Sequence, residues 1–189
     1  MNTGTVQIMW KEIGIGLILL CLLRVILDIY MIKKYKTLVA MHGRIPAEAF
    51  RAKAQKHLKR CGLFAVGPWN KQIYAAYNGL CWLLAMDALQ EGLEEVFLIW
   101  LSKVRKEEEF EAKAFTLSLY FRAKGQEKIA GQHYEMYLKS KHSDQNISVI
   151  MRGLFEGTEQ AETIREAARE FKNPALIQLL KNNGIEPNQ

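Results

Sequence analysis

An apolar run of twenty residues, Ile13–Ile32, limits what this chain can fold into more than any other feature. At about 1.5 Å per residue, a helix of this length reaches roughly 30 Å, the thickness of the hydrocarbon core of a bilayer. Only Arg24 and Asp28 interrupt the run, and their spacing of four places them on one helix face, where they can neutralise each other. Each central Leu, Ile or Val favours insertion by ~0.3–0.6 kcal/mol, which outweighs the cost of this intramembrane pair. The sequence therefore predicts one transmembrane helix.

A cleaved signal peptide is the alternative interpretation of this run. No basic leader precedes the apolar core, and no small-x-small cleavage site follows it. A basic leader and such a cleavage site are typical of signal peptides, so their absence favours a retained anchor.

The positive charge of the chain is concentrated directly after the apolar run. The net charge of the whole chain is +6, whereas residues 33–60 hold nine basic residues and one acidic residue, Glu48. Juxtamembrane basic residues include Lys33, Lys34, Lys36, Arg44, Arg51 and Lys53. Because positively charged flanks stay in the cytosol, we expect the N-terminus outside and the bulk of the protein in the cytosol. These residues either only fix the topology or also attract anionic lipid headgroups weakly, and no nucleic-acid partner is expected.

The domain organisation follows from this anchor. We expect a short extracytoplasmic tail (1–12), the transmembrane helix (13–32), a basic juxtamembrane segment with an amphipathic helix (33–68) and a helical domain (69–189). The amphipathic helix, at 46–61, has a stripe of Phe50, Ala54, Leu58 and Cys61 that either lies on headgroups or docks on another helix. Further helices are predicted at 70–90, 93–106, 108–124, 126–140, 144–156, 159–172 and 174–182.

Three glycines, Gly92, Gly125 and Gly157, recur at spacings of 33 and 32 residues. Each ends one helical pattern and is followed within a few residues by another. Glycine accepts backbone angles that other residues resist, so it lets two helices close tightly. A helix–turn–helix repeat of this length is typical of a stacked α-solenoid, in which neighbouring units bury one another's apolar faces.

The middle unit resembles the tetratricopeptide repeat (TPR) family. Leu117, the turn at Gly125, Ala130 and Tyr134 fall where that family places its large, small and aromatic packing residues. The first and third units match less well, and the characteristic early Trp and closing Pro are missing. The resemblance implies an all-α chain with a right-handed solenoid of TPR-like helix pairs after the anchor. A different solenoid or an irregular helical bundle remains the alternative.

In the family that the middle unit resembles, the first helix of each pair lines a concave groove that binds a peptide or a partner helix. Counting back from the repeat glycines gives residues spaced i, i+4 and i+7, which share one helix face. Candidate groove residues are Trp82, Met86, Phe115, Leu119, Arg122 and Met151. The alternative is that this strip packs internally, against the basic helix or the C-terminal helix.

No catalytic or metal-binding pattern is present. Cys21, Cys61 and Cys81 have no disulfide or zinc spacing, and the four histidines are dispersed. We therefore expect no enzyme activity, no cofactor and no metal.

Two functions from different classes fit the sequence. In the first, a membrane-anchored cytosolic scaffold or adaptor binds a partner protein through its helical-repeat surface. In the second, the chain is an accessory subunit of a larger transport or secretion complex, and its transmembrane helix makes the key contacts through Arg24 and Asp28.

Overall fold

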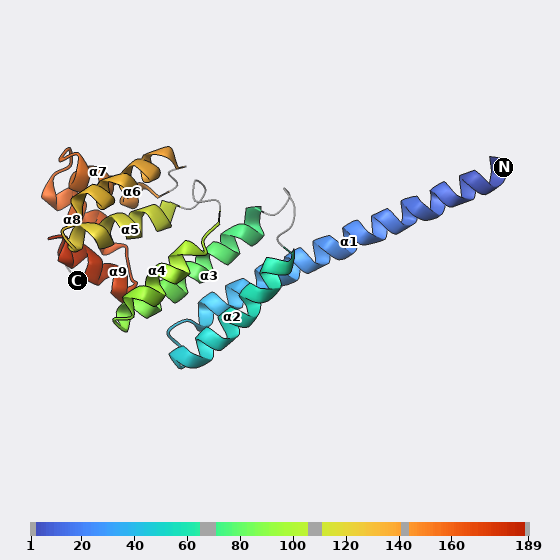
Figure 1. Cartoon of the computed structure of the whole chain (residues 1–189), viewed down its shortest axis with the longest axis horizontal. Coiled ribbons are helices and arrows are strands. Elements are labelled where there is room, and N and C mark those ends of the chain that lie inside the picture. The colour runs from blue at the N-terminus through green and yellow to red at the C-terminus, as the bar shows by residue number, and fades with distance from the viewer. Residues whose placement is uncertain (1–2, 65–70, 106–110, 141–143, 188–189) are drawn as a thin grey trace. The chain divides into compact units, whose positions relative to one another are not determined.

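The computed structural model describes residues 3–64, 71–105, 111–140 and 144–187, which form nine α-helices and no strand (Figure 1). The helices are α1 Thr3–Met41, α2 Ala47–Phe64, α3 Lys71–Gln90, α4 Glu94–Ser102, α5 Glu111–Ala123, α6 Glu127–Lys139, α7 Gln145–Phe155, α8 Ala161–Arg169 and α9 Pro174–Asn182. The all-α class predicted from the sequence is confirmed.

The chain divides into two compact units, Met1–Ala76 and Tyr77–Gln189. The division falls within α3, which continues without a break through Gly79. The domain boundary predicted at residues 68 and 69 lies outside the described residues.

The first unit is built on α1, a single helix of 39 residues. Its segment Ile13–Met41 is the one described helical segment that is long and apolar enough to cross a membrane. The large apolar side chains from Ile13 to Ile26 are exposed, as Ile18 and Leu20 show at 62% and 63% exposure. The second half has a buried face that includes Met31 and Leu38.

A tight turn after α1 sends the chain back along it as α2 (Figure 1). Gly43 has a φ of +72°, which an L-residue with a side chain resists. The His42 and Phe50 rings then meet at 4.8 Å between centroids, where α2 begins. The buried face of α2 comprises Phe50, Ala54, His57, Leu58 and Cys61. The stripe predicted for this helix is therefore buried against protein, and α2 packs along α1.

In the second unit, glycine turns close the helical hairpins. Gly92 and Gly125 have φ values of +76° and +70°, and the residue after each donates its N–H to a carbonyl five residues back, at 2.8 Å and 2.9 Å. This is the Schellman arrangement, which satisfies carbonyls at the end of a helix. Gly157, at +67°, ends α7 differently, because its own N–H bonds to the Arg152 carbonyl. In the third hairpin, the donor of this hydrogen bond is thus the glycine itself rather than the residue after it.

Side chains from successive helices form one core in this unit. Helices α5 and α6 pack together, α7 packs on α8, and α9 packs on α5. Trp82 on α3 donates from Nε1 to Thr116 Oγ1 on α5 at 3.0 Å. Two capped ends fix later helices: Asp144 accepts from the first N–H groups of α7, and Asn173 accepts from Leu176 N in α9.

Candidate functional site

The strip predicted to line a groove is mostly inside the second unit. Met86 and Phe115 are each 1% exposed, and Leu119 and Met151 are fully buried. These four side chains belong to the core cluster and offer no open surface to a partner. Binding through them would require the unit to open, so their i, i+4, i+7 spacing here reflects internal packing.

The C-terminal part of the chain covers this strip on α5. Helix α9 packs on α5, and Phe171, just after α8, lies 5.7 Å from Phe115 between ring centroids. Asn183 donates from Nδ2 to the Leu119 carbonyl at 2.9 Å, and the apolar face of α9 is buried. On α5, the strip therefore packs internally against the C-terminal helix, which is the alternative named in the sequence analysis.

The other two groove candidates, Trp82 and Arg122, are half-buried. The Trp82 indole is held by its hydrogen bond to Thr116. The Arg122 guanidinium pairs with Glu127 at 3.4 Å and lies over the Phe155 ring at 5.4 Å. Both therefore join neighbouring helices within the unit.

A second apolar surface, which the sequence analysis did not identify, lies on α4. Leu93, Val96 and Ile99 are 44%, 38% and 52% exposed, while Phe97 and Leu101 on the opposite side of the helix are buried. We call the three exposed residues the α4 face. A helix that is apolar nearly all round is normally buried all round, yet this side of α4 lies open among the described residues of the unit. The signal available in the sequence was the unusually apolar stretch VFLIWL at 96–101.

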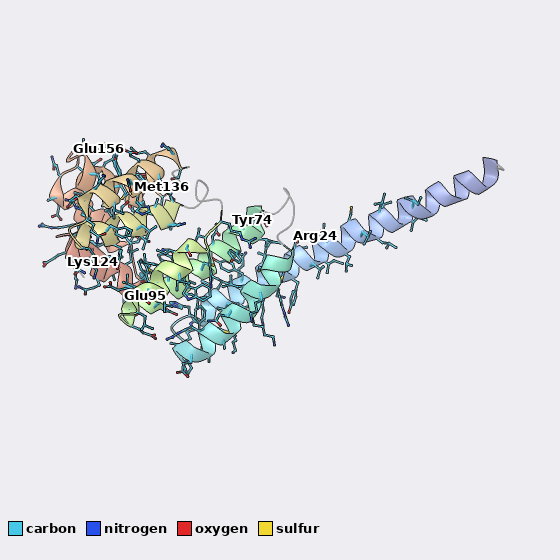
Figure 2. All side chains as sticks on the ribbon, in the orientation of Figure 1. Arg24, Tyr74, Glu95, Lys124, Met136 and Glu156 are labelled. Carbon is cyan, nitrogen blue, oxygen red and sulfur yellow. The ribbon has the colours of Figure 1, made fainter. Side chains whose placement is uncertain are left out.

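The intramembrane candidates Arg24 and Asp28 lie together on α1 (Figure 2 labels Arg24). Arg24 Nε is 3.1 Å from Asp28 Oδ1, and the two side chains are 37% and 26% exposed. The predicted intrahelical pair is therefore formed. Of the juxtamembrane basic residues, Arg51 is half-buried on α2, and the others are exposed, namely Lys33, Lys34, Lys36, Arg44 and Lys53.

Titratable side chains in the second unit serve as ties between helices. Tyr120 donates to Glu94 Oε2 at 2.9 Å, and Tyr134 donates to Glu156 at the end of α7. Burial, followed by the bond to Glu94, raises the pKa of Tyr120 to about 12. Burial, followed by the bond to Glu156, likewise raises the pKa of Tyr134. Phenols with such pKa values stay protonated at neutral pH, so neither is a general base there.

The cysteine and metal chemistry is equally limited. Burial raises the pKa of the Cys61 thiol to about 11, which disfavours the reactive thiolate. Among the described residues, no group of three His, Cys, Asp or Glu side chains is placed to hold a metal ion. In comparisons with known proteins, no family model, no curated protein and no solved structure matches this chain.

Proposed function

We propose that this protein is a single-pass membrane scaffold whose helical unit, Tyr77–Gln189, binds a partner protein in the cytosol. Tethering of this kind raises the local concentration of the partner at the membrane without chemistry of its own. The observation that carries the proposal is the α4 face, where three large apolar side chains at intervals of three residues lie open.

The anchor half of the proposal is supported by the way α1 continues into folded protein. Met31 lies within the apolar run predicted to span the bilayer, yet it is buried in the α1–α2 hairpin. Removal of the run as a signal sequence would strip α2 of part of its packing partner. The basic residues after the run support a cytosolic C-terminal side. Protease added to intact cells should then leave the C-terminal unit uncut, and its digestion would contradict this orientation.

The binding half is supported by the spacing of the α4 face. Leu93, Val96 and Ile99 follow one another at intervals of three, which gives a ridge suited to packing against a partner helix. Lys103, whose Nζ lies 3.9 Å from the centroid of the Trp100 ring, adds a cation beside this ridge. An amphipathic helix of the partner, with acidic residues flanking its apolar stripe, has the matching chemistry.

We further propose that this unit is a right-handed, TPR-like solenoid. Hairpins closed at Gly92, Gly125 and Gly157, together with buried Ala130 and Tyr134 in the middle unit, support it. An experimental structure of the full chain would test the handedness, and a left-handed or irregular stack would overturn it.

The test of partner binding compares two apolar residues of almost equal exposure. Ile99 is 52% exposed on the α4 face, and Leu138 is 50% exposed on α6. In crosslinked, detergent-solubilised membranes, Ile99→Gln should abolish capture of the partners that the wild-type chain captures, whereas Leu138→Gln should retain them. Each surface change should alter the free energy of unfolding by no more than about 0.5 kcal/mol, which thermal denaturation checks. Equal capture by both variants would refute binding through α4.

A further inference from the structure

The α1–α2 hairpin carries most of the excess positive charge of the chain on its surface. Residues 33–60 hold nine basic residues and one acid, and eight of the nine basic side chains are exposed. Because the apolar face of α2 is buried, this helix cannot roll its apolar stripe into a bilayer. Its position relative to the membrane is therefore set by α1.

Contacts between the two helices fix which basic residues lie nearest to the apolar half of α1. His42 meets Phe50 near the turn, and farther along the hairpin the His57 imidazole lies close to the backbone of Met31. The two helices therefore run antiparallel. In both contacts the two residue numbers add up to about 90, so a residue of α1 lies beside the residue of α2 that completes this sum. Lys59 is then level with Met31, close to the end of the apolar run.

The apolar surface of α1 ends at the same level. The large apolar side chains from Ile13 to Tyr30 are exposed, except Leu27, which is half-buried, and Tyr30 itself is 50% exposed. These eighteen residues span about 27 Å at 1.5 Å per residue, close to the thickness of a hydrocarbon core. An exposed Tyr at the end of such a segment is typical of the membrane–water interface. The headgroup layer then begins near Tyr30.

Basic residues surround the hairpin at this level. Lys33 lies on the side of α1 opposite its buried face, and Lys59 lies on the outer side of α2, with Lys34 and Arg60 between them. The basic collar, as we call this set, consists of Lys33, Lys34, Lys56, Lys59 and Arg60.

We propose that the basic collar binds the headgroups of anionic phospholipids and thereby fixes how deeply α1 sits in the bilayer. This inference rests on the proposed membrane anchor but not on partner binding. It differs from a general attraction of basic residues to membranes, because the hairpin holds the basic residues of α1 and α2 at different distances from the bilayer. Lys53 is six residues before Lys59 along α2, about 9 Å farther from the bilayer, and Arg44 lies beyond Met41, at least about 15 Å from the level of Met31.

Electrostatic attraction to the membrane surface falls off within a Debye length, about 8 Å at physiological salt. A basic residue in the collar should therefore strengthen binding of an anionic lipid about fivefold, whereas one beyond this distance should contribute little. This difference allows a charge-matched test.

The experiment uses the full chain in nanodiscs of phosphatidylcholine that contain a trace of acyl-labelled phosphatidylglycerol or, separately, acyl-labelled phosphatidylcholine. A donor fluorophore at the exposed position Thr37 reports the enrichment of each lipid around the protein. Lys59→Gln/Arg60→Gln is compared with Arg44→Gln/Lys53→Gln, which removes the same charge from positions farther from the bilayer. Circular dichroism checks that both variants keep their helices.

We expect the wild-type chain to enrich phosphatidylglycerol and the collar variant to lose at least about fivefold of this preference. The Arg44→Gln/Lys53→Gln variant should keep the preference for phosphatidylglycerol, and about 0.5 M salt should abolish this preference. Equal losses in both variants, or no preference in the wild type, would overturn the collar. Alkaline extraction of native membranes tests the anchor separately: a chain that stays in the membrane without lipid preference contradicts the collar alone.

Discussion

Gly153, inside α7, allows a close approach between two helices. A Cβ built at this position would lie 2.3 Å from Ile164 Cδ1 and 2.7 Å from Ile164 Cγ1 on α8. Contacts this short force the neighbouring side chain or the helix to shift. Gly153 therefore permits close packing of α7 on α8 because it has no side chain. No periodic pattern in the sequence reveals this role.

Gly153→Ala should gain less stability than helix propensity alone supplies, about 1 kcal/mol, because the end of the Ile164 side chain has to move aside. The matched control is Gly131→Ala in α6, where nothing lies within 4 Å of the added Cβ. That variant should stabilise the protein by up to about 1 kcal/mol. Denaturant unfolding of the full chain in detergent measures both changes, and equal stabilisation of the two variants would disprove the tight contact.

Pairing of α1 with α2 should depend on pH through His57, which is 4% exposed. Burial lowers the pKa of His57 below its usual value near 6.5, and the nearby charges of Lys34 on α1 and Arg60 on α2 lower it further, against a smaller opposing effect of its backbone hydrogen bond. The folded hairpin thus holds the neutral ring, whereas the separated helices allow it to protonate. Stability is fully present above about pH 6.5 and is lost as pH falls below it, toward the lowered pKa.

Energy transfer between fluorophores at Thr37 and Gln55, both exposed, measures this pairing in a cysteine-free chain. The transfer efficiency should fall between about pH 6.5 and pH 5 as the helices separate. In a His57→Leu background the fall should be weaker. An identical pH profile in the two backgrounds would show that another group is responsible.

Most elements were predictable from the sequence because helix periodicity and glycine stops are local signals. The last helix was predicted at 174–182 and is observed as Pro174–Asn182, capped by Asn173. By contrast, the helix predicted at 93–106 ends at Ser102. Asn78 bonds both the carbonyl and the N–H of Arg105, so a distant side chain satisfies the backbone that the helix would otherwise have used.

The candidate binding surface was harder to predict, because the spacing of apolar residues does not say which element covers them. Phe115 and Leu119 have the same spacing whether they face a partner or α9. Their assignment depends on a fold-back of the chain, including the bond from Asn183, 64 residues away from Leu119. Conversely, the exposed side chains of α4 are as apolar as the buried ones, so composition alone does not distinguish the two sides of this helix.

At the scale of the whole molecule, the two proposed functions differ in what the membrane helix must do. In a scaffold, Arg24 and Asp28 only need to neutralise each other, as their 3.1 Å contact allows. In an accessory subunit of a membrane complex, they would contact another chain. With the headgroup layer near Tyr30, as proposed for the basic collar, Asp28 lies about 3 Å and Arg24 about 9 Å inside the hydrocarbon core.

Replacing both residues, Arg24→Leu/Asp28→Leu, should therefore leave membrane insertion and partner capture unchanged, since two charges give way to residues that favour insertion. Arg24→Leu alone is the control, because it leaves an unpaired Asp28 and should reduce insertion. Alkaline extraction and crosslinking of native membranes measure the two properties. Loss of capture by the inserted double variant would favour the accessory-subunit function.

The unbroken course of α1 has a mechanical consequence. One continuous helix runs from the apolar segment into the hairpin, and α2 is clamped along it by buried side chains. In the proposed membrane arrangement, a turn of α1 about its own axis would carry α2 and the basic collar around with it, because α2 is packed along the same continuous helix.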